Sequence, residues 1–129
     1  MKNGLALLIL NILLVIFSIY QIISIRSISY SINYYAGVEL NGLAANPNYD
    51  YESVGKDAIG EFNKRKSTIT LFAFISVSVS LILLLLSILT KEKVIIKTVN
   101  IVISLIAFIS SSYIALIVAN CIRNINLLT

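Results

Sequence analysis

The sequence predicts an all-α integral membrane protein with three transmembrane helices, and two observations carry this prediction. First, long stretches without a charged residue run from Leu5 to Ile25, from Ile69 to Leu89 and from Thr98 to Ile122. Each is long enough to cross a bilayer, which takes a helix of about 20 apolar residues. Second, 58% of the residues are hydrophobic, whereas soluble domains are normally about 45–50% apolar. We therefore treat 1–129 as a single membrane domain with spans at about 5–25, 69–89 and 98–122.

We expect the first span, 5–25, to be retained rather than cleaved as a signal peptide, because a signal has an apolar region of about 7–15 residues and a small-residue cleavage site. Asn11 and Ser18 give this span a faintly polar face. Two interpretations of its aliphatic face stay open. That face contacts lipid while Asn11 turns toward the other spans, or it forms a heptad seam with a partner helix. Its isoleucines recur every three or four residues, at Ile9, Ile12, Ile16, Ile19 and Ile23.

The polar segment 26–68 is expected to lie outside the membrane. Residues 27–34 alternate polar and apolar side chains, which is typical of a strand, but the same residues also fit a helix that continues from the first span. We favour the helix because no second strand is available for pairing. Asn41-Gly42 and Asn46-Pro47-Asn48 are turn signals. A helix from Asp50 to Lys66 is predicted to lead into the second span, with acidic residues early and basic residues late, as the helix dipole favours.

Small residues recur along one face of each of the last two spans. Small side chains let transmembrane helices approach closely, and serines add hydrogen bonds between them. We therefore predict that these spans form an antiparallel hairpin, with contact between copies of the chain or a polar path as alternatives. A path is the weakest, because no charged residue lies within the spans. The predicted packing residues are Ala73, Ser76 and Ser80 in the second span and Ser104, Ala107, Ser111 and Ala115 in the third.

Four tyrosines of the polar segment are the best candidates for a binding site. Tyrosine is common at the membrane interface, but these four lie far from the spans in sequence. Tyrosine is also a favoured anchor in protein interfaces. We therefore predict a partner-binding role for Tyr34, Tyr35, Tyr49 and Tyr51.

The chain offers no recognisable catalytic, cofactor-binding or metal-binding motif. It contains no histidine, which removes the commonest general base and metal ligand. Its single cysteine, Cys121, excludes an intramolecular disulfide. The net charge of +4 comes from lysines and arginines, several of them near span ends, where such residues report topology and headgroup contact. We expect no enzymatic activity, no cofactor and no nucleic acid partner.

The sequence favours a small membrane protein that acts through protein–protein interaction, as an accessory or regulatory subunit or as an immunity-type protein. The alternative is a self-assembling pore, either holin-like or a small transport component, motivated by the small-residue stripes. The expected partners are membrane lipids and either another membrane protein or a second copy of the chain. Frequent Ile, Lys, Asn and Ser are typical of AT-rich bacterial genomes, which indicates a bacterial cytoplasmic membrane.

The distribution of positive charge addresses the orientation of the chain. Lysines and arginines near span ends mark the cytoplasmic side. Counted helix by helix, they favour a cytoplasmic N-terminus, because Lys91, Lys93 and Lys97 precede the third span and only Arg123 follows it. When the lysines and arginines of whole segments are counted instead, they favour a cytoplasmic position for residues 26–68. We expect the N-terminus in the cytoplasm.

Overall fold

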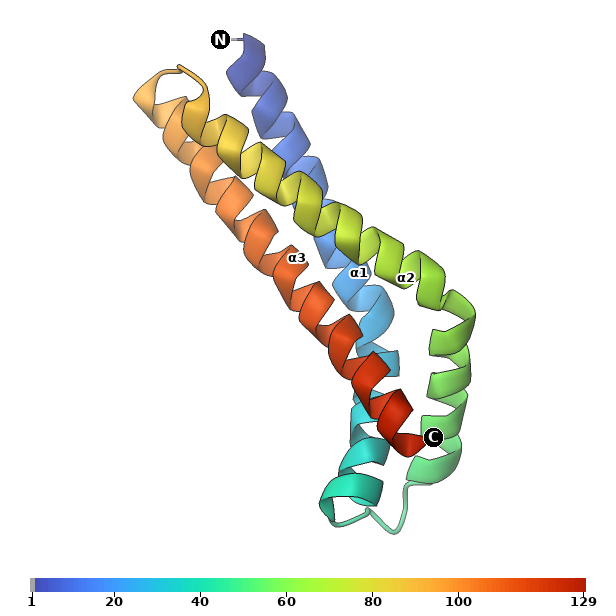
Figure 1. Cartoon of the computed structure of the whole chain (residues 1–129). Helices are drawn as coiled ribbons and strands as arrows, with labels where there is room; N and C mark the ends of the chain where they lie inside the picture. Colours follow the sequence, from blue (N-terminus) through green and yellow to red (C-terminus); the bar gives the residue numbers. More distant parts are fainter. Residues whose placement is uncertain (1) are drawn as a thin grey trace.

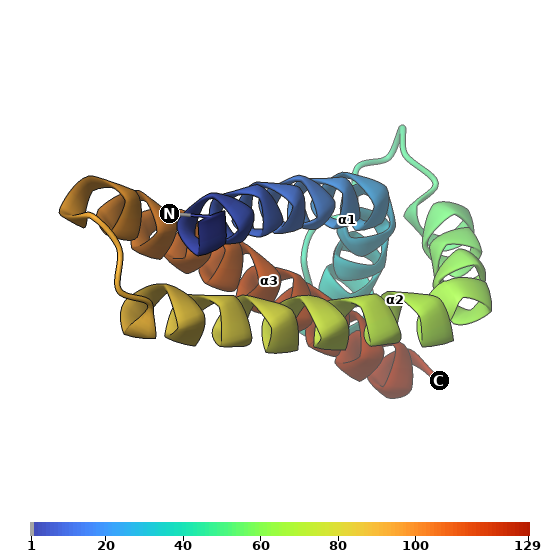
Figure 2. The same ribbon diagram turned by 90° about the horizontal axis from the view of Figure 1, so that it is seen from above.

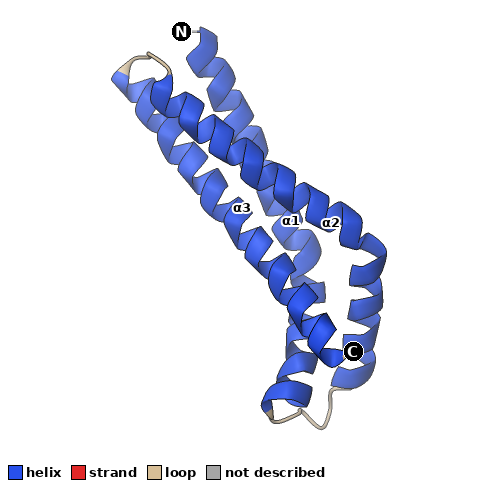
Figure 3. Cartoon of the chain, viewed as in Figure 1, coloured by secondary structure: helices blue, strands red, loops and turns tan. Residues whose placement is uncertain are grey.

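The computed structural model describes residues 2–129 and consists of three long helices: α1 (Lys2–Asn41), α2 (Tyr51–Leu89) and α3 (Val94–Leu128). Figure 3 shows helix throughout this range except at two short connections and the last residue. Each helix is long and apolar enough to cross a membrane. The predicted fold class is confirmed, and residues 27–34 are helical rather than extended. The chain is a multi-pass membrane protein.

Two of the helices extend well beyond the apolar stretches at the same end of the molecule. The 40 residues of α1 reach about 60 Å at a rise of 1.5 Å per residue, which is about twice the thickness of a bilayer core. α2 has 39 residues and is similarly long. We call residues 27–67 the head: it contains the end of α1, the loop 42–50 and the start of α2. Figure 1 shows it as a helical hairpin continuous with both spans, and α2 bends where it enters the head.

Local signals explain where the head turns. Gly42 adopts a φ of 70°, a conformation that glycine adopts without strain, and α1 ends immediately before it. Asn46 then organises the loop, since its side-chain oxygen accepts a hydrogen bond of 3.0 Å from the Asn48 backbone N–H. The Asp50 carboxylate accepts a hydrogen bond of 3.3 Å from the Ser53 backbone N–H and so caps α2. These contacts confirm both turn signals and the helix predicted to follow Asp50.

Contacts at the two ends of the bundle define the helix directions. At one end, the Glu92 carboxylate between α2 and α3 accepts a hydrogen bond of 3.0 Å from the Gly4 backbone N–H. At the other end, the Asn124 side-chain amide donates a hydrogen bond of 2.9 Å to Asn33. Thus α1 and α3 run parallel, and α2 runs opposite to both, which is consistent with an antiparallel α2–α3 hairpin (Figure 1). Seen from above, the helices form a bundle rather than a flat layer (Figure 2).

The buried residues of α1 and α3 recur at alternating spacings of three and four. Such a repeat forms the inner seam of a left-handed coiled coil. The isoleucine repeat of α1 has the same spacing but lies on the outer face, with exposures from 42% at Ile12 to 69% at Ile23. This position agrees with the lipid-facing interpretation. The inner seam contains Gly4, Leu7, Asn11, Leu14, Ser18, Gln21, Ile25, Ile28 and Ile32 in α1, and Asn100, Ser104, Ala107, Ser111, Ile114, Val118, Cys121 and Ile125 in α3.

Two clusters of buried apolar residues fill the bundle. One lies near the N-terminal end and includes Leu7, Leu14 and Leu83. The larger one extends from the spans into the head and includes Ile25, Ile28, Ile32, Phe62, Ile114 and Cys121. Phe62 and Ile32 are completely buried there. The head is therefore packed on the same core as the spans.

Candidate functional site

The four tyrosines predicted to bind a partner come together in one cluster at the tip of the head. The ring centroid of Tyr34 lies 5.4 Å from that of Tyr49 and 6.3 Å from that of Tyr51. Tyr35 lies 6.0 Å from Tyr51. All four side chains are half-buried. The cluster joins α1, the connecting loop and α2, so it packs the tip together and leaves part of each residue at the surface.

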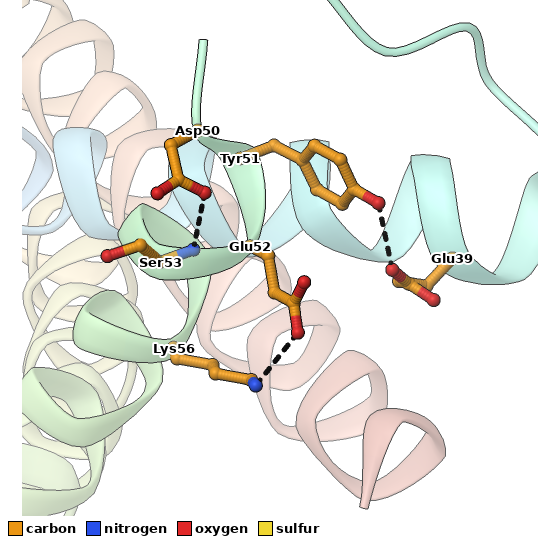
Figure 4. Close-up of polar contacts among 6 residues, drawn as sticks. All are labelled: Glu39, Asp50, Tyr51, Glu52, Ser53 and Lys56. Carbon is orange, nitrogen blue, oxygen red and sulfur yellow. Dashed lines mark hydrogen bonds and ion pairs between the residues drawn. The ribbon is translucent and has the colours of Figure 1, made fainter.

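Hydrogen bonds fix the polar ends of two of these tyrosines. The Tyr34 hydroxyl accepts a hydrogen bond of 2.9 Å from the Asn46 backbone N–H. The Tyr51 hydroxyl donates one of 3.0 Å to the Glu39 carboxylate (Figure 4), and this bond raises the pKa of Tyr51. One turn into α2, Lys56 donates a hydrogen bond of 2.9 Å to Glu52, which raises the lysine pKa. The hydrogen bond between Tyr51 and Glu39 thus joins α2 to α1 across the loop at the tip.

A glycine lets the two helices of the head approach each other. Gly55 of α2 is buried against Tyr35 of α1. A Cβ atom added at Gly55 would lie 2.5 Å from the Cβ of Tyr35, which is too close for any side chain. Residue type and position in the sequence point to the tyrosines but not to Gly55 or Glu39. Gly55 reads in sequence only as a weak helix former, and its close neighbour is 20 residues away along the chain.

The head separates its charges. Its acidic side chains are exposed: Glu39, Asp50, Glu52, Asp57 and Glu61. Lys64, Arg65 and Lys66 lie next to the apolar stretch of α2, and Arg26 lies at the end of that of α1. Apart from Lys56, the outer part of the hairpin therefore carries negative charge, while its base carries positive charge.

The predicted helix-packing residues lie in the interior of the bundle. Ala73, Ser76, Ser80, Ser104, Ala107 and Ser111 are buried, and Ala115 is half-buried. The hairpin expectation is incomplete in one respect, because α1 also contacts both stripes. Gln21 donates a hydrogen bond of 2.6 Å to the Ser76 hydroxyl, and the Ser18 and Ser111 hydroxyls lie 3.3 Å apart. Gln21 was missed in the sequence, although it follows Ser18 by three residues and so shares its helix face.

Buried polar side chains share the interior of the spans with the apolar clusters. The Ser80 and Ser104 hydroxyls donate hydrogen bonds of 2.8 and 3.0 Å to carbonyl oxygens one turn earlier in their own helices. Asn11 is completely buried, and neither polar atom of its side chain has a hydrogen-bond partner among the described residues. An unpaired buried amide is energetically costly. The polar face of α1 is nevertheless inside, because the alternative is exposure to lipid.

Residues 2–129 contain no group of three or more His, Cys, Asp or Glu side chains that could hold a metal ion. Cys121 is completely buried in the larger apolar cluster. The fold and these sites define a class of protein: a three-span membrane bundle with buried polar side chains among its apolar core residues and a helical head beyond the apolar stretches. No protein-family model, curated protein or solved structure matches the chain.

Proposed function

We propose that this protein is a non-enzymatic membrane protein that binds another protein through its head. The observation that carries the proposal is the tip of the hairpin, where four packed tyrosines and the Tyr51–Glu39 hydrogen bond hold α1, the loop and α2 together. Part of the surface of each tyrosine remains exposed. A surface that is ordered before binding loses less entropy when a partner docks.

The chemistry of this surface favours a partner with a basic patch. Asp57 and Glu61 are exposed and form no ion pair with another described residue. They follow Tyr51 along the part of α2 that belongs to the head, and complementary charge guides association and fixes orientation. Aromatic rings supply the apolar contact of many interfaces. This combination supports the role of an accessory, regulatory or immunity-type subunit of another membrane protein.

A pull-down from cell membranes in mild detergent tests the proposal. The wild-type chain is compared with the double variant Asp57→Asn, Glu61→Gln and with Lys93→Gln at the opposite end of the bundle. We expect a partner to be recovered by the wild type and by Lys93→Gln, and to be lost with the double variant. Recovery of the chain alone, or equal recovery by all three proteins, would contradict the proposal.

We further propose that the N-terminus is cytoplasmic, that the head lies on the opposite side and that the membrane is a bacterial cytoplasmic membrane. The lysines before α3 support this orientation, since they lie at the N-terminal end of the bundle. Labelling Cys121 would not report orientation, because its side chain is completely buried. Ser53→Cys and Asn3→Cys, each combined with Cys121→Ser, place an exposed thiol at either end. A membrane-impermeant maleimide should label only Ser53→Cys in intact cells; labelling of Asn3→Cys alone would reverse the assignment.

One observation favours the alternative of a self-assembling pore. The seam inside the spans contains polar side chains, and that of Asn11 has no hydrogen-bond partner among the described residues. Its serines and Asn11 are buried within one copy of the chain, so conduction would need several copies or a rearrangement of the helices. Conductance of the purified protein across a planar bilayer, abolished by Ser80→Leu, would replace the interaction proposal with this one.

A further inference from the structure

A groove opens between α1 and α3 at the base of the head. It has a volume of about 800 Å³, within the range of about 300–1,000 Å³ that is typical of ligand sites. Ile22, Leu116 and Ile117 line its apolar part, and Arg26, Asn33 and Asn120 line its polar part. We propose that this groove binds an anionic phospholipid, with the headgroup phosphate at Arg26. This site is separate from the tyrosine cluster and does not depend on the proposed partner.

The groove lies at the level where a membrane surface is expected. Arg26 is the first charged residue after the apolar stretch of α1. Tyr30 and Tyr113 also line the groove, and they are 65% and 55% exposed. Exposed tyrosines concentrate at the boundary between hydrocarbon and headgroups. A lipid in the adjoining leaflet could therefore enter the groove from the side without leaving the bilayer.

Arg26 provides a cation that no described residue neutralises. Its side chain is exposed and makes no ion pair or hydrogen bond with another described residue. No acidic residue lines the groove. A guanidinium group presents parallel N–H donors that match two oxygens of one phosphate, which makes arginine the preferred residue for this anion. The charge of the groove thus fits a phosphate.

An amide network orders the polar end of the groove. The Asn33 side-chain oxygen accepts hydrogen bonds of 3.1 Å from Asn120 and 2.9 Å from Asn124. These bonds join α1 to α3 and hold Asn120 at the groove wall. Away from this end, the lining changes to Ile22, Leu116 and Ile117. The order of headgroup and acyl chain in a phospholipid matches this change from polar to apolar.

The test measures lipid retention by the purified full-length chain in a neutral detergent. The probes are dioleoyl phosphatidylglycerol and dioleoyl phosphatidylcholine, which share acyl chains and differ in net headgroup charge. Retained lipid is counted by native mass spectrometry for the wild type, Arg26→Gln and Arg123→Gln. Arg123 is the matched control, because it is exposed on α3 near the same end but does not line the groove. Inorganic phosphate at millimolar concentration is added in a separate arm.

We expect the wild type to retain phosphatidylglycerol about tenfold better than phosphatidylcholine, because both headgroups present the phosphate but the choline ammonium brings a like charge close to Arg26. Arg26→Gln should remove this preference, and Arg123→Gln should keep it, with unchanged helical circular dichroism in both. Absence of the preference in the wild type, or equal loss in both variants, would overturn the proposal. Displacement of the lipid by inorganic phosphate would assign the site to a soluble anion instead.

Discussion

At the tip of the head, the absence of one methyl group decides how closely α1 and α2 approach. Gly55 allows Tyr35 to lie directly on the α2 backbone. Tyr35 in turn packs against Tyr51, whose hydroxyl bonds to Glu39. Composition and spacing predicted which tyrosines belong together. They did not predict Gly55, because the need for a small residue arises only from the approach of a second helix.

The first prediction concerns this contact. Gly55→Ala should lower the free energy of unfolding by about 1–3 kcal/mol, the usual cost of overpacking, because the new Cβ would meet Tyr35. The matched control is Gly60→Ala in the same helix, where nothing lies within 4 Å of an added Cβ. That variant should gain about 0.5–1 kcal/mol from better helix propensity. Thermal unfolding in detergent measures both, and equal shifts in the same direction would refute the assigned role of Gly55.

The second prediction concerns pH. The hydrogen bond to Glu39 raises the pKa of Tyr51 above its ordinary value of 10.0. A raised pKa means that the folded state holds the proton more tightly, so this stabilisation is complete below pH 10.0 and is lost as pH rises through the folded-state pKa. The midpoint of thermal unfolding should therefore fall at alkaline pH in the wild type, and the fall should be smaller in Tyr51→Phe and in Glu39→Gln. An identical decline in all three proteins would show that the bond contributes nothing.

At the scale of the helices, two repeats with the same spacing compete on α1. The isoleucine repeat and the repeat through Asn11 and Ser18 are both heptad-like, and spacing alone cannot tell which one faces inward. In water the aliphatic repeat would be buried. In lipid the preference is reversed, because polar side chains find partners only between helices. This preference supports the lipid-facing interpretation of the isoleucine repeat. Gln21, which the sequence did not single out, lies on the same inner seam as Asn11 and Ser18.

The third prediction tests the inner seam of α2. Ser80 is completely buried, whereas Ser78 in the same helix is half-buried. Ser80→Leu should destabilise the bundle by about 1–3 kcal/mol, because the added atoms have no space between the helices. Ser78→Leu should be close to neutral. Resistance to unfolding by dodecyl sulfate measures both variants, and a neutral Ser80→Leu would show that the helices do not pack along this face.

At the scale of the whole molecule, head and spans share one core. Hydropathy predicted the three spans, and turn signals predicted where the segment between the first two reverses. The sequence did not show that this segment would be docked on α3. Phe62 stands among charged residues in sequence, yet it packs in a cluster with Ile114 and Cys121 of α3. Such a contact depends on how three helices cross, which no local pattern reports.

The fourth prediction uses Cys121 as a reporter of this shared core. Phe62→Ala should destabilise the protein by about 3–5 kcal/mol through loss of buried surface and the cavity left behind. It should also speed modification of the Cys121 thiol, which is completely buried in the wild type. Phe74→Ala is the control, because Phe74 is 70% exposed on the outer face of α2. If both variants leave the labelling rate unchanged, head and spans are not coupled through Phe62.

Because α1 continues without a break from its span into the head, the distance between the membrane surface and the tyrosine cluster is limited. From Arg26 to Asn41 the helix is unbroken, and at 1.5 Å per residue these residues rise about 22 Å. No flexible tether separates the tyrosine tip from the bilayer, so the tip samples only a thin layer above the membrane surface. The partner proposed above must enter that layer, and a protein anchored in the same membrane does so by lateral diffusion alone. Encounter then becomes a search in two dimensions, whose rate depends on the surface density of both proteins.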